Sequence, residues 1–327
     1  MAICEIKILL LQPMTRIEES IVNEVEEEIK PKTWKDVAWS VIKTLLKIGV
    51  TSVLLYYVFR NVHFADVKYR LFHANYWWMF AALVSFFISM VVSAWRLQSF
   101  FRSIELKLDP RFNFRLYLLG LFYNFLLPGG IGGDGYKIYL LKKNYQLPAR
   151  KVFWAIMFDR LSGLWAIGLI TVALIFLIPQ IDVHIAIPLG IFAAASAVYY
   201  FVAYKFFREY TRYFFEGHLK AVLVQGLQVL TIVFVLIGQD FTGKFSPYLL
   251  SFLISALATI IPISVGGAGI RETVFTQLTK VFPMDKSLAV FLPGSFYIIS
   301  LLVALLGVYY VIRPKRLEKG LPSFEEK

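Results

Sequence analysis

Charged residues interrupt the most apolar parts of this chain in three short groups. Each group combines opposite charges: Asp134 with Lys137, Asp159 with Arg160, and Arg271 with Glu272. Charges inside a membrane segment are costly, and they face a cavity or one another. Such cations can bind a lipid phosphate, while the carboxylates orient them or meet a positively charged headgroup. The alternative is that each group is an internal ion pair or helix cap that only holds the fold together.

Two glycine-rich segments share one framework, Pro-x-x-aliphatic-Gly-Gly-x-Gly-x-basic, and begin 134 residues apart. The first contains Pro128, Gly129, Gly130, Gly132, Gly133 and Gly135, and the second contains Pro262, Gly266, Gly267 and Gly269. Glycine accepts positive φ angles and lets a ligand approach the backbone. We interpret both segments as breaks between half-helices, whose N-termini attract anionic groups. Two flexible surface loops are the alternative, because glycine clusters often mark loops.

Asn124, four residues before Pro128, completes the candidate substrate-binding set, because its amide can serve a headgroup or the backbone. Lys137 and Arg271 close the two copies of the framework at equivalent positions. We therefore expect both cations to contribute to one shared site.

Other chemistries find little support in the sequence. Gly130-x-Gly132-x-x-Gly135 matches the dinucleotide fingerprint, but its flanks are apolar and not part of a βαβ unit. There is no Walker A sequence or Gly-x-Ser-x-Gly elbow. Cys4 is the only cysteine, and the histidines lack metal-ligand spacing. We assign no catalytic residue and expect neither a metal nor a cofactor.

Composition identifies the class of protein. Hydrophobic residues make up 58% of the 327 residues, aromatic residues 17% and charged residues 17%. This balance predicts an all-α polytopic membrane protein. The net charge of +12 does not indicate nucleic-acid binding, because the basic residues are dispersed between apolar stretches.

Six stretches are long enough to cross a bilayer, which takes about 20 apolar residues. They lie near 38–59, 76–95, 153–178, 185–204, 220–238 and 288–312. Two shorter apolar runs, 116–127 and 248–261, each end in a glycine-rich break and precede a short helical segment, 136–142 or 270–280. The sequence thus predicts eight apolar helices, and the short runs are either ordinary spans or halves of re-entrant hairpins.

The distribution of basic residues distinguishes these alternatives. If all eight runs cross, with the N-terminus inside, the internal loops hold 6 basic residues and the external loops 15. If 114–142 and 247–280 are re-entrant, the inside loops hold 14 and the outside loops 7, with both basic tails also inside. Only the second arrangement obeys the positive-inside rule. We therefore predict six full spans plus two re-entrant helical hairpins, with both termini cytoplasmic.

This topology contains an inverted repeat, a plan common among transporters. The first repeat covers about 38–178 and the second about 185–312, within a membrane domain at 36–312. Residues 1–35 form an acidic N-terminal tail, with Met14 as an alternative start to Met1, and 313–327 form a basic C-terminal tail.

The chain resembles the flippase-like family that shares the transmembrane domain of lysylphosphatidylglycerol synthases. The resemblance covers about 38–312 and rests on the segments 124–134 and 262–272, on Lys137, and on Asp159-Arg160. It implies a lipid translocase of the plasma (inner) membrane. Only 313–327 follows the last span, so we expect no lipid aminoacylation by this chain.

The resemblance implies membrane lipids as partners: an anionic or aminoacylated phospholipid, or a glycolipid. A homodimer and a lipid-synthesis enzyme partner remain open associations. The alternative functions are a glycosyltransferase-like membrane enzyme or accessory subunit of lipid or glycolipid biosynthesis, and a non-transporting scaffold.

Overall fold

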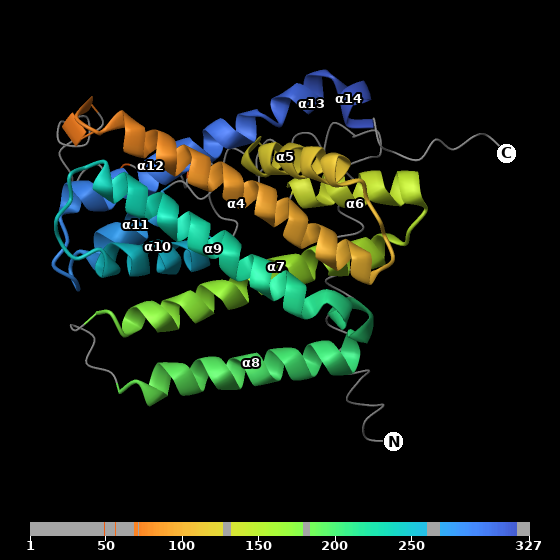
Figure 1. The fold of residues 1–327 in the computed structure, drawn as a ribbon, viewed down its shortest axis with the longest axis horizontal. Helices are drawn as coiled ribbons and strands as arrows, with labels where there is room; N and C mark the ends of the chain where they lie inside the picture. The colour runs from red at the N-terminus through yellow and green to blue at the C-terminus, as the bar shows by residue number, and fades with distance from the viewer. Residues whose placement is uncertain are drawn as a thin grey trace.

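The computed structural model describes residues 49, 56, 69–70, 72–126, 132–178, 184–259 and 269–318. The predicted span 38–59, the acidic tail 1–35 and the end of the chain from 319 lie outside these residues. So do six predicted break residues: Pro128, Gly129, Gly130, Pro262, Gly266 and Gly267. All regular secondary structure in the described ranges is helical, which confirms the all-α prediction there (Figure 1).

Five helical segments are long and apolar enough to cross a membrane. They are α4 (Tyr76–Ser103), α7 (Ala149–Ile175), α8 (Ala186–Phe206), the 3₁₀ helix η1 (Arg208–Tyr213) with α9 (Phe214–Ile237), and α12 (Lys286–Leu305) with α13 (Val308–Ile312). These segments coincide with five of the six predicted spans. α4 extends eight residues beyond the predicted end at 95, so Arg96 and Arg102 belong to the helix.

Two pairs of shorter helices form hairpins. The first consists of α5 (Pro110–Leu126) and α6 (Gly132–Tyr145), and the second of α10 (Ser246–Ala258) and α11 (Ile270–Leu278). At 1.5 Å per residue, even α5 is only about 26 Å long, which is less than the hydrocarbon thickness of about 30 Å. α5 begins six residues before the predicted apolar run, because Asn113 is buried and donates from Nδ2 to the Ala94 carbonyl oxygen at 2.6 Å.

The two hairpins lie at opposite ends of the bundle, with α4 and α9 crossing between them (Figure 1). α4 ends and α7 begins beside the α5–α6 hairpin, whereas α9 ends and α12 begins beside the α10–α11 hairpin. The first helix of each hairpin also packs against a long helix of the other half: α5 against α12, and α10 against α7.

The apolar core consists of two clusters. One gathers side chains around the second hairpin, including Phe252, Phe275 and Phe296. The other lies around the first hairpin and includes Phe100, Phe112 and Phe158. The clusters hold the long helices together at both ends of the bundle, and most of the buried charges lie on α4, α6, α7 and α9.

α8 is the most exposed span, with Ala203 as its one buried residue. It packs on α7, where Trp165 Nε1 donates to Ser196 Oγ at 3.0 Å. Part of the predicted C-terminal tail is the short helix α14 (Pro314–Glu318). α14 lies against α5, because Arg115 Nη1 donates to the Arg316 carbonyl oxygen at 3.0 Å.

Candidate functional site

Two glycines set the close packing of α5 and α6. A Cβ added to Gly133 would collide with the carbonyl group of Gly120, so the two backbones approach as closely as this residue type allows. Asn124 Oδ1 accepts a hydrogen bond from Gly133 N at 2.9 Å. Of the two roles that the sequence allows for the Asn124 amide, the structure shows the backbone one. Asn124 thereby fixes the start of α6.

Asp134, in the first turn of α6, is bound by two cations. Lys137 Nζ lies 3.1 Å from Oδ1, and Arg160 of α7 approaches Oδ2 with both Nε and Nη2. The side chain of Lys137 is 6% exposed, whereas that of Arg160 is 46% exposed. Lys137 Nζ also lies 4.6 Å from the centroid of the Tyr117 ring. The carboxylate of Asp134 thus meets two cations, and the side chain of one of them, Arg160, is partly accessible.

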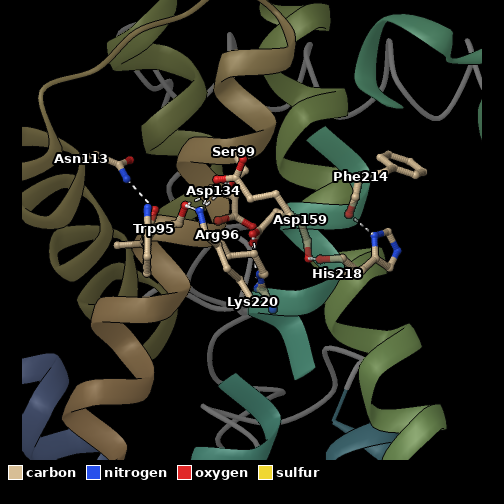
Figure 2. Close-up of polar contacts among 12 residues, drawn as sticks. Trp95, Arg96, Ser99, Asn113, Asp134, Asp159, Phe214, His218 and Lys220 are labelled. Carbon is tan, nitrogen blue, oxygen red and sulfur yellow. Dashed lines mark hydrogen bonds and ion pairs between the residues drawn. The ribbon is translucent and has the colours of Figure 1, made fainter. Parts of the chain in front are cut away.

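Asp159, which precedes Arg160 in the chain, pairs with Arg96 of α4 (Figure 2). Arg96 Nε donates to Oδ1 at 2.7 Å and Nη2 to Oδ2 at 3.0 Å, and both side chains are buried. Arg96 lies just beyond the predicted span 76–95, so this pair was not predicted. The position of Arg96 directly after the apolar run 76–95 was the available signal.

The second hairpin arranges its charges differently. Gly269 has φ 84°, a conformation that favours glycine, and its N–H donates to Glu272 Oε2 at 2.8 Å. Glu272 is buried and caps the start of its own helix. The Arg271 guanidinium carbon lies 5.1 Å from the Phe296 ring centroid and 5.7 Å from that of Phe252. Its buried Nη1 has no hydrogen-bond partner among the described residues.

The two copies of the glycine framework differ at one position that explains this contrast. Where the first copy carries Asp134, three residues before Lys137, the second carries Ala268, three residues before Arg271. Lys137 is neutralised by a carboxylate, and Arg271 meets aromatic faces instead. An arginine that lies over aromatic rings and forms no ion pair with the described residues can accept an anionic ligand.

The structure brings Asn124, Asp134, Lys137 and Arg160 together at the start of α6. Asp159 adjoins this group through Arg160 but contacts α4, and Arg271 and Glu272 lie on the other hairpin. α12 links the two hairpins, because the ring centroids of Tyr297 and Phe125 lie 5.6 Å apart. Phe125 follows Asn124, and Tyr297 follows Phe296, the ring over which Arg271 lies.

The sequence analysis also missed a polar cluster between α4 and α9. Lys220 is buried, and its Nζ lies 2.5 Å from Glu216 Oε1, 2.9 Å from Ser99 Oγ and 4.1 Å from the Trp95 ring centroid (Figure 2). Lys220 is the first residue of the predicted span 220–238 and was counted with the basic residues of the preceding loop, whereas α9 begins at Phe214. His218, two residues before the predicted span, is also buried, and its Nδ1 lies 2.8 Å from the Phe214 carbonyl oxygen.

Within the described part of the chain, no group of three or more His, Cys, Asp or Glu side chains could hold a metal ion. The carboxylates named above are instead occupied by arginine, lysine or backbone N–H groups. The chemistry of the arrangement is therefore the binding of charged groups.

The long apolar helices and the charged interior define an integral, polytopic helical membrane protein. Residues 44–221 match the family described as the lysylphosphatidylglycerol synthase TM region, and the chain belongs to this family. The match confirms the resemblance seen in the sequence. A comparison with curated proteins found no match.

Proposed function

We propose that the protein is a lipid translocase that moves a phospholipid or a related lipid between the two leaflets of its membrane. Arg160, Lys137 and Arg271 would bind the headgroup phosphate while the acyl chains stay in the surrounding lipid. Membership of a family named after an enzyme of a phospholipid supports a lipid-related role.

The observation that carries this proposal is a partly accessible arginine in a membrane-spanning helix. Arg160 pairs with Asp134, and its side chain is nevertheless 46% exposed. Charged side chains in such segments usually face a cavity or mark the path of a substrate. A lipid phosphate is the anion that a membrane supplies in the largest amount, and arginine binds phosphate at two points.

The arrangement of the hairpins supports transport rather than static binding. We interpret the described helices as two inverted repeats, with α4–α7 in one and α8–α12 in the other. The reciprocal contacts of α5 with α12 and of α10 with α7 agree with this interpretation. So does the position of the hairpins at opposite ends of the bundle. Inverted repeats of this kind let a central site open alternately to two sides.

The contacts suggest distinct roles within the candidate set. Asn124 and Glu272 accept hydrogen bonds from Gly133 N and Gly269 N, so we propose that they position α6 and α11. Asp159 anchors α7 to α4 through Arg96. Asp134 holds Arg160 and Lys137 in place. Phosphate binding then rests mainly on the accessible Arg160 and on Arg271.

Charge also supports an orientation. The basic residues at the end of the bundle that holds the α5–α6 hairpin are Arg102, Lys107, Arg111, Arg115, Lys142, Lys143, Arg150, Lys151, Lys205, Arg208, Arg212, Arg313, Lys315 and Arg316. Those at the opposite end, among the described residues, are Arg70, Lys244, Lys280 and Lys286. By the positive-inside rule, we propose that the first end faces the cytoplasm of a plasma (inner) membrane. The topology predicted from the sequence adds that both chain termini are cytoplasmic. A homodimer or a lipid-synthesis enzyme as partner remains part of the proposal.

The test is lipid transfer by purified protein in liposomes that contain a fluorescent phospholipid. We expect wild-type protein to expose inner-leaflet label to a membrane-impermeant quencher. Arg160→Gln and Arg271→Gln should each slow this at least tenfold, whereas Lys315→Gln at the exposed cytoplasmic end should not. Wild-type rates in both arginine variants would overturn the site assignment. Absence of transfer by folded wild-type protein would overturn the translocase and favour the enzyme or scaffold alternative.

A further inference from the structure

A second group of charged residues lies on the outer face of the bundle, away from the candidate transport site. It forms where the end of α4 meets η1 and the start of α9. Arg102 comes from α4, Arg212 and Tyr213 from η1, and Glu216 from the first turn of α9. We call these four residues the α4–α9 cradle. The cradle is at the end of the bundle with the larger number of basic residues.

The two carboxylate oxygens of Glu216 differ in their contacts: Oε1 accepts from several donors, and Oε2 accepts from none among the described residues. Lys220 Nζ at 2.5 Å, Ser99 Oγ at 3.1 Å and Arg102 Nη1 at 3.5 Å all approach Oε1. Oε2 has no partner among the described residues, and the side chain is 35% exposed. A carboxylate oxygen in this state can accept a hydrogen bond from a molecule outside the protein.

Arg102 and Arg212 share the ring of Tyr213. Their guanidinium carbons lie 4.3 Å and 5.7 Å from its centroid. The side chain of Arg102 is 43% exposed, and its single contact with Glu216 leaves other N–H groups able to donate. Lys220 is already held by Glu216 and Ser99. The cradle therefore presents two cations beside one free carboxylate oxygen.

Apolar side chains extend from the cradle along the same helix. Phe215 is 85% exposed, and Leu219 and Leu223 follow at intervals of four residues, which keeps them on one face of α9. Trp95 of α4 is also exposed, seven residues before Arg102 and thus about 10 Å deeper along the helix. An exposed apolar stripe on a membrane-spanning segment is suited to contact acyl chains, and basic residues at the end of such a segment are suited to contact headgroups.

We propose that the α4–α9 cradle binds a phospholipid whose headgroup carries both a phosphate and a hydrogen-bond-donating ammonium, as phosphatidylethanolamine does. The phosphate accepts from Arg102 and Arg212, and the ammonium donates to Glu216 Oε2. The acyl chains follow Phe215, Leu219 and Leu223. A quaternary ammonium has no N–H group, so phosphatidylcholine lacks the second contact. This site holds a resident lipid and is separate from the residues proposed to transfer lipid.

The test is the binding of three lipids with identical acyl chains to full-length protein in detergent, followed by native mass spectrometry. The probes are phosphatidylethanolamine, phosphatidylcholine and phosphatidylglycerol. We expect phosphatidylethanolamine to bind at least fivefold more tightly than phosphatidylcholine. Arg102→Gln should weaken phosphatidylethanolamine binding at least fivefold. Lys107→Gln removes the same charge from an exposed position five residues further along the chain and should leave binding unchanged.

Removing Glu216 alone would leave Lys220 buried without its carboxylate, so the headgroup preference is tested with Glu216→Gln combined with Lys220→Met. This variant should bind phosphatidylethanolamine and phosphatidylcholine equally. Equal binding of the two lipids to wild-type protein, or an undiminished preference in the double variant, would overturn the proposal. Phosphatidylglycerol binding as tightly as phosphatidylethanolamine would overturn the ammonium assignment.

Discussion

Arg96 of α4 and Asp159 of α7 form a two-point ion pair in the middle of the helix bundle. Two nitrogens of the guanidinium meet the two oxygens of the carboxylate at 2.7 Å and 3.0 Å. Arg96 also contacts Gly163, one turn further along α7, where an added Cβ would lie 3.1 Å from Nη1. The pair therefore fixes both the distance and the register of α4 against α7. Because Arg160 follows Asp159 directly, it also sets the direction of the accessible cation.

Breaking this pair should cost more stability than removing it completely. Arg96→Met or Asp159→Leu alone leaves one buried charge without its partner, which costs about 3–5 kcal/mol. The double variant buries apolar side chains of similar size and should recover most of that loss. Thermal unfolding in detergent measures the three variants. Two single losses that simply add in the double variant would show that the residues are not coupled.

The contact between Gly133 and Gly120 should tolerate no side chain. Gly133→Ala forces the α5 and α6 backbones apart, since the colliding atoms belong to the backbone and cannot rotate away. We expect a loss of stability of about 3 kcal/mol or more, at the upper end of the usual cost of overpacking. Gly226→Ala is the matched control, because a Cβ there has no neighbour within 4 Å. It should be neutral or slightly stabilising, as alanine favours helices. Equal melting temperatures of the two variants would contradict the close approach.

Asp285 combines two roles that different substitutions separate. Its Oδ1 accepts from Leu288 N at 2.7 Å, which caps α12, and lies 2.9 Å from Arg70 Nη2. Asp285→Asn keeps a capping oxygen but loses the charge, and should cost less than about 1 kcal/mol, as exposed pairs do. Asp285→Ala should cost about 1 kcal/mol more, because the cap is lost as well. Melting temperatures at low and high salt check this. Salt should reduce the difference in melting temperature between wild type and Asp285→Asn. It should not change the difference between Asp285→Asn and Asp285→Ala.

The sequence predicted five of the described spans and the existence of both helical hairpins. These features depend on the length of apolar runs and on glycine-rich breaks, which a single chain displays directly. The prediction of a paired Asp134 and Lys137 is confirmed, because residues three apart on a helix are neighbours whatever surrounds them. The ion pair between Arg160 and Asp134 connects α7 to α6. The spacing of these two residues in the sequence does not predict this pair.

The ends of α4 and α9 were predicted less well, and this had consequences for the site. An apolar run ends at its last apolar residue, but a membrane helix continues while its polar residues find partners inside the bundle. Arg96 forms an ion pair with Asp159, and Lys220 contacts Glu216 and Ser99. Both cations therefore lie within their helices. Counting these cations as loop residues hid an ion pair and a polar cluster. Tertiary partners such as these are not visible in hydropathy.

Ala268→Asp should convert the second glycine framework into a copy of the first and reduce lipid transfer. Lys137 Nζ lies 3.1 Å from the acid that precedes it by three residues. A carboxylate three residues before Arg271 in the chain would likewise bring a negative charge close to that cation. Arg271, now neutralised, would no longer compensate a phosphate. We expect transfer in liposomes to fall about tenfold, which corresponds to roughly 1.4 kcal/mol of lost binding or transition-state stabilisation. Asparagine is nearly the same size as aspartate but carries no charge, so Ala268→Asn should reduce the transfer rate much less. Equal rates for Asp and Asn would mean that the charge of Arg271 takes no part in transfer.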